Sequence, residues 1–132
     1  MAAYDTTFTG EITITPPLPW SAIHDSPFVP DSRGFADRDC KFRLDTATVE
    51  TDEGTLTRKQ AVAVTCTYDN PCGAYDIVEH LQELIDTHGE GRTFAGFIEA
   101  DGANAGDLWR LTVIDGRAIR VQPRIVWPDI PA

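Results

Sequence analysis

The sequence predicts an α+β fold, in which one long helix packs on one face of an antiparallel sheet of five to six strands. Several short segments alternate apolar and polar residues, which is typical of half-buried strands. One segment, residues 75–88, instead repeats its apolar residues at helical spacing. Because these segments show no β-α-β repetition along the chain, the sequence argues against a parallel doubly wound sheet.

Size and charge narrow the class of protein. The chain has 132 residues, which fits one domain spanning residues 1–132. Its formal net charge of −10 disfavours binding to nucleic acid or to an anionic membrane. No apolar run approaches the roughly 20 residues of a membrane-spanning helix, and residues 1–8 do not resemble a secretory signal. We therefore expect a cytoplasmic protein without a membrane or nucleic-acid partner.

The first predicted strand covers residues 8–15, where apolar residues alternate with threonine and glutamate. Prolines at positions 16 and 17 are expected to end it, because proline cannot donate to the ladder of a sheet. Residues 16–39 are predicted to form an irregular loop region with one helical turn at 20–25, since residues 26–39 are rich in Pro, Gly, Asp and Ser.

The second and third strands, around residues 40–45 and 62–66, are predicted to form a hairpin. A three-residue loop at Asp52–Gly54 would bring their apolar residues onto one face, with Gly54 in the left-handed conformation. The pairs opposed in this register are Leu44 with Val62, Phe42 with Val64, and Cys40 with Cys66. We expect the two cysteines to be reduced, because the compartment is expected to be reducing.

Residues 75–88 form the long helix that the sequence predicts. Its apolar stripe consists of Ile77, Leu81, Leu84, Ile85 and His88. Gly89 is a natural C-terminal stop. Beside it runs an acidic stripe, formed by Asp76, Glu79, Glu83 and Asp86. The acidic stripe is either a solvated helix face or a surface that binds a basic protein partner through salt-sensitive contacts.

Three further strands are predicted around residues 94–98, 108–113 and 118–127. The last two can be joined by a two-residue turn at Asp115-Gly116 or by a three-residue loop, Ile114–Gly116. We favour the three-residue loop, because it keeps the apolar residues of both strands on one face. Trp109 and Trp127 would then face the core.

The favoured loop also places Arg110 opposite Arg120, with Arg124 further along the same face. One explanation is that these arginines pair with carboxylates of neighbouring strands, such as Glu11 or Glu99. The other is an anion site, because guanidinium groups bind phosphate and carboxylate in bidentate fashion. On that hypothesis Arg110, Arg120 and Arg124 hold a phosphate-bearing ligand.

The sequence gives no pattern that selects catalytic residues. It contains no glycine-rich phosphate loop, no nucleophile elbow and no HExxH motif. The three histidines are scattered, and cysteines of this kind are most often small buried hydrophobes. We therefore predict no catalytic residue, no metal site and no cofactor.

Both ends of the chain carry motifs that point to a known group. The opening FTGEITITPPL, residues 8–18, and the later segments GDLWR, VIDGR and RIVWP are similar to those of small uncharacterised proteins from Streptomyces-like actinobacteria and their phages. That group is defined only as a domain of unknown function. The resemblance implies an actinobacterial or phage source and transfers no catalytic residues.

Taken together, the sequence favours a non-enzymatic accessory protein, encoded by a phage or prophage, that binds a protein partner through its acidic surface. The alternative is a domain that binds a small anionic ligand through the arginine face of its C-terminal hairpin.

Overall fold

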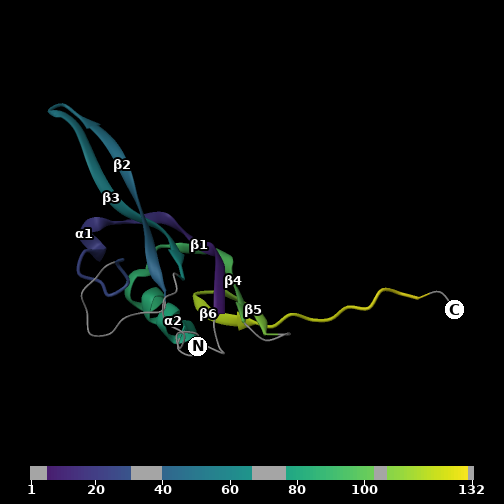
Figure 1. The fold of residues 1–132 in the computed structure, drawn as a ribbon. Coiled ribbons are helices and arrows are strands. Elements are labelled where there is room, and N and C mark those ends of the chain that lie inside the picture. The colour runs from purple at the N-terminus through teal and green to yellow at the C-terminus, as the bar shows by residue number, and fades with distance from the viewer. Residues whose placement is uncertain (1–5, 31–39, 67–76, 103–106, 131–132) are drawn as a thin grey trace.

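In the computed structural model, six strands form one antiparallel sheet in the order β2-β3-β1-β4-β5-β6 (Figure 1). The structure describes residues 6–30, 40–66, 77–102 and 107–130. In chain order the elements are β1 Thr6–Pro19, α1 Trp20–Ile23, β2 Lys41–Thr51, β3 Gly54–Thr65, α2 Ile77–His88, β4 Thr93–Gly102, β5 Leu108–Ile114 and β6 Arg117–Val121. The predicted α+β class is confirmed, although α2 has only 12 residues and a second, four-residue helix precedes β2.

The core lies between α2 and one face of the sheet. The apolar stripe of α2 is buried as predicted at Ile77, Leu81, Leu84 and Ile85. It packs in one cluster with inward-facing strand residues such as Ile12, Ile14, Ile98 and Leu111. Residues that alternate with these, including Glu11 and Thr13, stand on the other face of the sheet. No helix in the described part of the chain is long and apolar enough to cross a membrane.

The first strand is longer than predicted. Pro16 and Pro17 do not end it, because β1 continues to Pro19. Its pairing with β3 is irregular between Thr13 and Leu18, so the prolines lie where the ladder is interrupted and no donor is required. Buried Leu18 then resumes the pairing. The predicted loop region 16–39 is therefore wrong for its first residues, while residues 31–39 lie outside the described part.

The hairpin β2–β3 has a shorter turn than predicted. Thr51 pairs with Gly54, so the turn consists of Asp52 and Glu53 alone. The hydroxyl of Thr51 stabilises this turn, because it donates to the carbonyl of Gly54 at 2.8 Å and accepts from the Glu53 amide at 3.3 Å. The predicted three-residue loop is wrong by one residue.

An irregularity in the pairing of β2 with β3 offsets the effect of the shorter turn on the register. The register shifts between Arg43 and Leu44. Leu44 therefore faces Ala61, whereas Val62 was its predicted partner. Beyond the shift, Phe42 faces Val64 as predicted, and both are buried. The extra residue of a bulge thus restores the inward orientation that the turn alone would have lost. Cys40 and Cys66, next to this pairing, are both buried thiols.

The hairpin β5–β6 uses the two-residue turn that we did not favour. Ile114 pairs with Arg117, which leaves Asp115 and Gly116 as the turn. Their φ angles are 52° and 77°, as a type I′ turn requires. Asp-Gly tolerates this left-handed backbone, and the turn follows the natural twist of the strands. Local turn geometry therefore decided the register against the apolar pattern.

The chain leaves the sheet after β6. The predicted strand 118–127 is wrong beyond Val121, because proline at position 123 cannot donate to a ladder. Residues 122–130, which we call the exposed segment, run away from the body of the molecule (Figure 1). Trp127, predicted to face the core, is 80% exposed. At the opposite edge of the sheet, the outer parts of β2 and β3 also project from the body (Figure 1).

Candidate functional site

The predicted arginine face does not form, because Arg110 and Arg120 point to opposite faces of the sheet. Arg120 lies opposite buried Leu111, on the core face, and its guanidinium stacks 4.2 Å from the ring centre of Trp109. Arg110, the neighbour of Leu111 in β5, points to the other face. Arg124 lies in the exposed segment. The three guanidinium groups therefore do not converge on one ligand.

Two ion pairs of the open sheet face support the simpler explanation of these charges. The Arg110 side chain donates to Glu99 at 3.2 Å and stacks on the ring of Phe97 at 4.1 Å. Glu11 accepts two hydrogen bonds from Arg43, at 2.6 and 2.9 Å, rather than pairing with the C-terminal arginines. The hydrogen bond from Arg43 lowers the pKa of Glu11 below its ordinary value.

The acidic stripe of α2 is only partly available to a partner. Glu79 and Asp86 are exposed, whereas Glu83 is half-buried and Asp76 lies outside the described residues. Asp86 accepts a hydrogen bond from Gln82 at 3.0 Å. The Gln82 amide also donates to the carbonyl of Gly116 and accepts from the amide of Ala118, at 3.1 and 2.8 Å. This polar face therefore also holds the β5–β6 turn against the helix.

A serine–histidine pair, which the sequence did not suggest, joins the turn after α1 to the end of α2. Ser26 Oγ lies 3.2 Å from His88 Nε2 and accepts a hydrogen bond from the Phe28 amide at 3.2 Å. The His88 ring also makes edge contacts with Phe28 and Phe42. Burial lowers the pKa of His88, and the charge of Asp25 opposes that shift. Ser26 is only 5% exposed, so its hydroxyl has no open path to a substrate.

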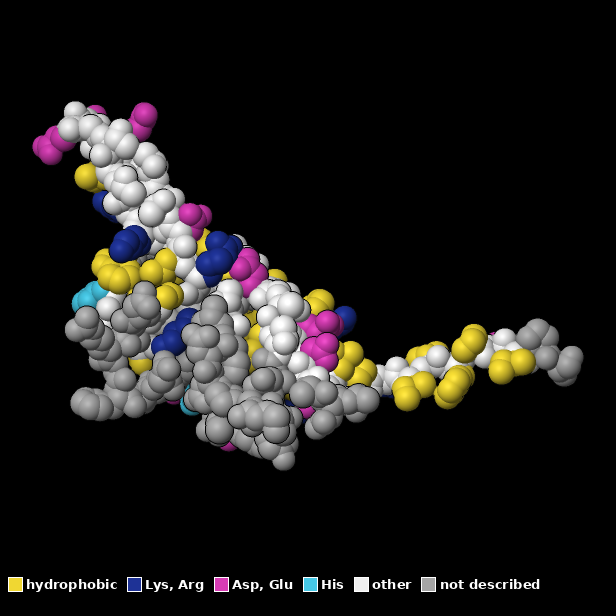
Figure 2. All heavy atoms as spheres, viewed as in Figure 1, with side chains coloured by type: hydrophobic (Ala, Val, Ile, Leu, Met, Phe, Trp, Pro, Cys, Tyr) yellow, Lys and Arg dark blue, Asp and Glu magenta, His cyan; other side chains and the backbone are white. Residues whose placement is uncertain are grey.

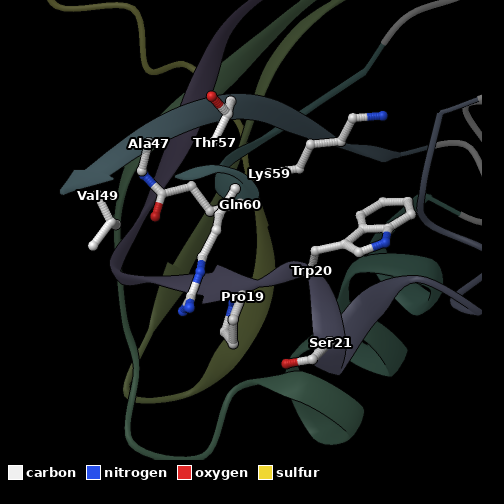
Figure 3. Close-up of a pocket in the computed structure, with 9 residues that line it drawn as sticks. Pro19, Trp20, Ser21, Ala47, Val49, Thr57, Lys59 and Gln60 are labelled. Carbon is white, nitrogen blue, oxygen red and sulfur yellow. The ribbon is translucent and has the colours of Figure 1, made fainter. Parts of the chain in front are cut away.

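A hollow of about 700 Å³ lies beside the outer part of the β2–β3 hairpin. We call it the hairpin groove. It is lined by Pro19, Trp20, Ser21, Ala47, Val49, Thr57, Arg58, Lys59 and Gln60. Figure 3 shows Pro19, Trp20 and Ser21, from the end of β1 and α1, across from side chains of the two hairpin strands. Only the tertiary fold brings these two stretches together, so no sequence pattern identified the groove.

Trp20 is the main aromatic surface of the hairpin groove. Its indole is 36% exposed, and the Lys59 ammonium lies 5.3 Å from its ring centre. In the described part of the chain, neither Lys59 nor Arg58 pairs with a carboxylate. The groove therefore combines apolar surface with two cations, which suits a ligand that is apolar and acidic.

The exposed segment is the second unexpected feature. Its large apolar side chains, each at least 80% exposed, are Ile125, Val126, Trp127 and Ile130. Figure 2 shows hydrophobic side chains spaced along this segment, well away from the body. Its two internal prolines, at 123 and 128, were a sequence signal against a long paired strand.

The fold and these surfaces define the class of protein, a small two-layer α+β protein with projecting elements that carry apolar side chains. The chain belongs to a family of unknown function, DUF6205, whose model matches residues 1–130. The comparisons with curated proteins and with solved structures gave no significant match. The prediction of a domain of unknown function is thus confirmed, whereas the actinobacterial or phage source stays a prediction.

Proposed function

We propose that this chain is a non-enzymatic accessory protein that binds another protein through its projecting elements. The observation that carries the proposal is the exposed segment, with four large apolar side chains that each stand at least 80% exposed. Burying one such side chain contributes about 1.5–3 kcal/mol. A run of them is typical of a surface that a partner covers.

The hairpin groove supports the same function. It is concave and mostly apolar around Trp20. Its cations, Arg58 and Lys59, pair with no carboxylate of the described residues and can fix the orientation of a bound segment. A non-enzymatic role agrees with the burial of the Ser26 side chain.

The acidic stripe of α2 is a second candidate for the contact. Glu79 and Asp86 are exposed, and neither forms an ion pair in the described part of the chain. Such carboxylates would attract a basic protein, with an affinity that falls as salt screens the charges.

We also propose, from the sequence motifs, that the gene belongs to an actinobacterium or one of its phages. A cytoplasmic location is part of this proposal.

Affinity capture from a lysate of an actinobacterial host tests the proposal. The full chain is used in three forms, the wild type and two variants, and the captured proteins are identified by mass spectrometry. We expect the wild type to retain a specific protein at high salt, and Trp127→Ser to lose it. The acidic stripe would be favoured instead if the captured protein were lost at high salt and also lost with the triple variant Glu79→Gln, Glu83→Gln, Asp86→Asn. A partner that neither variant affects would contradict both surfaces.

A further inference from the structure

We infer that the exposed segment of one copy of this chain docks in the hairpin groove of a second copy. The inference rests on the proposed function and names one partner for it. The exposed segment and the hairpin groove carry complementary groups, and they lie at opposite edges of the same sheet.

The exposed segment presents two different sides. In an extended chain, alternate side chains point to opposite sides, so Ile125, Trp127 and Asp129 share one of them. The opposite side carries Arg124, Val126 and Ile130. One side therefore offers two large apolar groups followed by a carboxylate, at intervals of about 6.6 Å.

The hairpin groove offers groups that match this side. Its apolar surface, with Trp20 and Val49, can receive the side chains of Ile125 and Trp127. The ammonium of Lys59 and the guanidinium of Arg58 border the same hollow and can receive Asp129. A carboxylate bound there would form a charge-assisted hydrogen bond with a cation that has no such partner in the described chain.

The positions of the two elements favour a second copy over the same copy. The exposed segment leaves from β6, at one edge of the sheet, while the groove lies beside β2 and β3 at the other. Five inter-strand spacings separate the edges, roughly 24 Å, whereas Ile125 follows Val121 by four residues, which span at most about 14 Å. Docking within one chain would require the segment to reverse at Val121 and cross the whole sheet, whereas it runs the other way (Figure 1).

Sedimentation equilibrium of the full chain, from about 1 to about 100 µM, tests the inference. We expect the wild type to associate. Trp127→Ser should weaken association at least about tenfold, because a buried tryptophan typically dominates an interface. Val126→Ser is the matched control on the opposite side of the segment, and it should weaken association less than about threefold. All of these side chains are exposed, so circular dichroism should show an unchanged fold.

A charge exchange tests the identity of the acceptor. Asp129→Lys and Lys59→Glu should each weaken association when studied alone. An equimolar mixture of the two variants should associate again, because the carboxylate then stands on the groove and the ammonium on the segment. Recovery in the mixture would also show that the two elements meet between copies.

Three results would overturn the inference. The first is a wild type that stays monomeric throughout the range, which would leave the proposed binding of another protein standing. The second is association that Trp127→Ser and Lys59→Glu both leave unchanged, since the interface would then lie elsewhere. The third is an equal loss from Val126→Ser and Trp127→Ser. Association of the wild type without capture of any other protein would support the inference alone.

Discussion

His88 shows how its surroundings decide what a residue can do. On sequence it completes the apolar stripe of a helix, and in the structure it shares a half-buried contact with Ser26 and two phenylalanine rings. A serine and a histidine at this distance in an open cleft would suggest a nucleophile and its base. Here the hydroxyl accepts from the Phe28 amide and is closed off from solvent, so the pair connects two segments of the fold.

The stability of the protein should fall on mild acidification because of His88. Its pKa is lowered in the folded state, so the unfolded chain binds the proton more readily. The free energy of unfolding should therefore decrease as the pH falls below about 6.5, the ordinary pKa of histidine. Urea titrations at pH 7.5 and 5.5 measure the difference.

The variant His88→Gln should show a smaller difference between these two pH values. His24→Gln, which changes an exposed histidine, should keep the wild-type difference. Glu11 does not confuse the comparison, because its lowered pKa removes stability only at more acidic pH. An equal pH dependence in wild type and His88→Gln would contradict this account.

Gly10 is a position where β1 leaves no room for a side chain. Its φ is +90°, and an added Cβ would lie 2.8 Å from the carbonyl oxygen of Phe97 in β4. Gly10→Ala should therefore destabilise the protein by roughly 1–3 kcal/mol in denaturant titrations. Gly91→Ala is the control, since Gly91 also has a positive φ but no atom within 4 Å of the added Cβ. A cost no larger than that of Gly91→Ala would show that the β1–β4 contact relaxes.

At the scale of elements, the sequence identified what depends on periodicity and missed what depends on local geometry. Alternation revealed the strands, and helical spacing identified the buried side of α2, because both patterns report one buried face. The two turns were each predicted one residue too long. At Asp115-Gly116 a type I′ turn overrode the apolar pattern, and at Asp52-Glu53 a bulge corrected the register downstream.

The candidate site could not be predicted from sequence for a related reason. The hairpin groove joins residues 19–21 to residues 47–60, and their approach depends on how far β1 and the hairpin extend. The arginine hypothesis failed because a register error of one residue moves a side chain to the opposite face. The exposed segment had an apolar alternation like that of a core strand, and only its prolines argued otherwise.

Gln82 links two elements, so its loss should cost more than that of a neighbouring helix residue. Its side chain makes hydrogen bonds to the backbone of Gly116 and Ala118, at 3.1 and 2.8 Å. Gln82→Ala should destabilise the protein by about 1–3 kcal/mol, because the half-buried amide of Ala118 loses its acceptor. Glu79→Ala, at an exposed position of the same helix, should cost less than about 0.5 kcal/mol. Thermal unfolding of both variants measures the difference, and equal costs would show that water replaces Gln82.

At the scale of the whole molecule, the chain divides its apolar residues between two tasks. Those on the inner face of the sheet and on α2 form one core cluster. Those of the exposed segment contribute nothing to that core, and neither do Val49 and Leu56 in the outer part of the β2–β3 hairpin. The body should therefore fold without the exposed segment. On the proposed function, a bound partner would bury the apolar groups of the segment.

Thermal stability should then depend on protein concentration. Association of folded copies stabilises the folded state by mass action, so the Tm of the wild type should rise as its concentration increases. Trp127→Ser should share the wild-type Tm at high dilution, because Trp127 is 80% exposed and lies outside the core. At high concentration its Tm should stay at that value while the wild-type Tm increases. A Tm that is independent of concentration in both proteins would mean that folded copies do not associate. A Tm of Trp127→Ser below that of the wild type at high dilution would mean that the exposed segment packs on the body of its own copy.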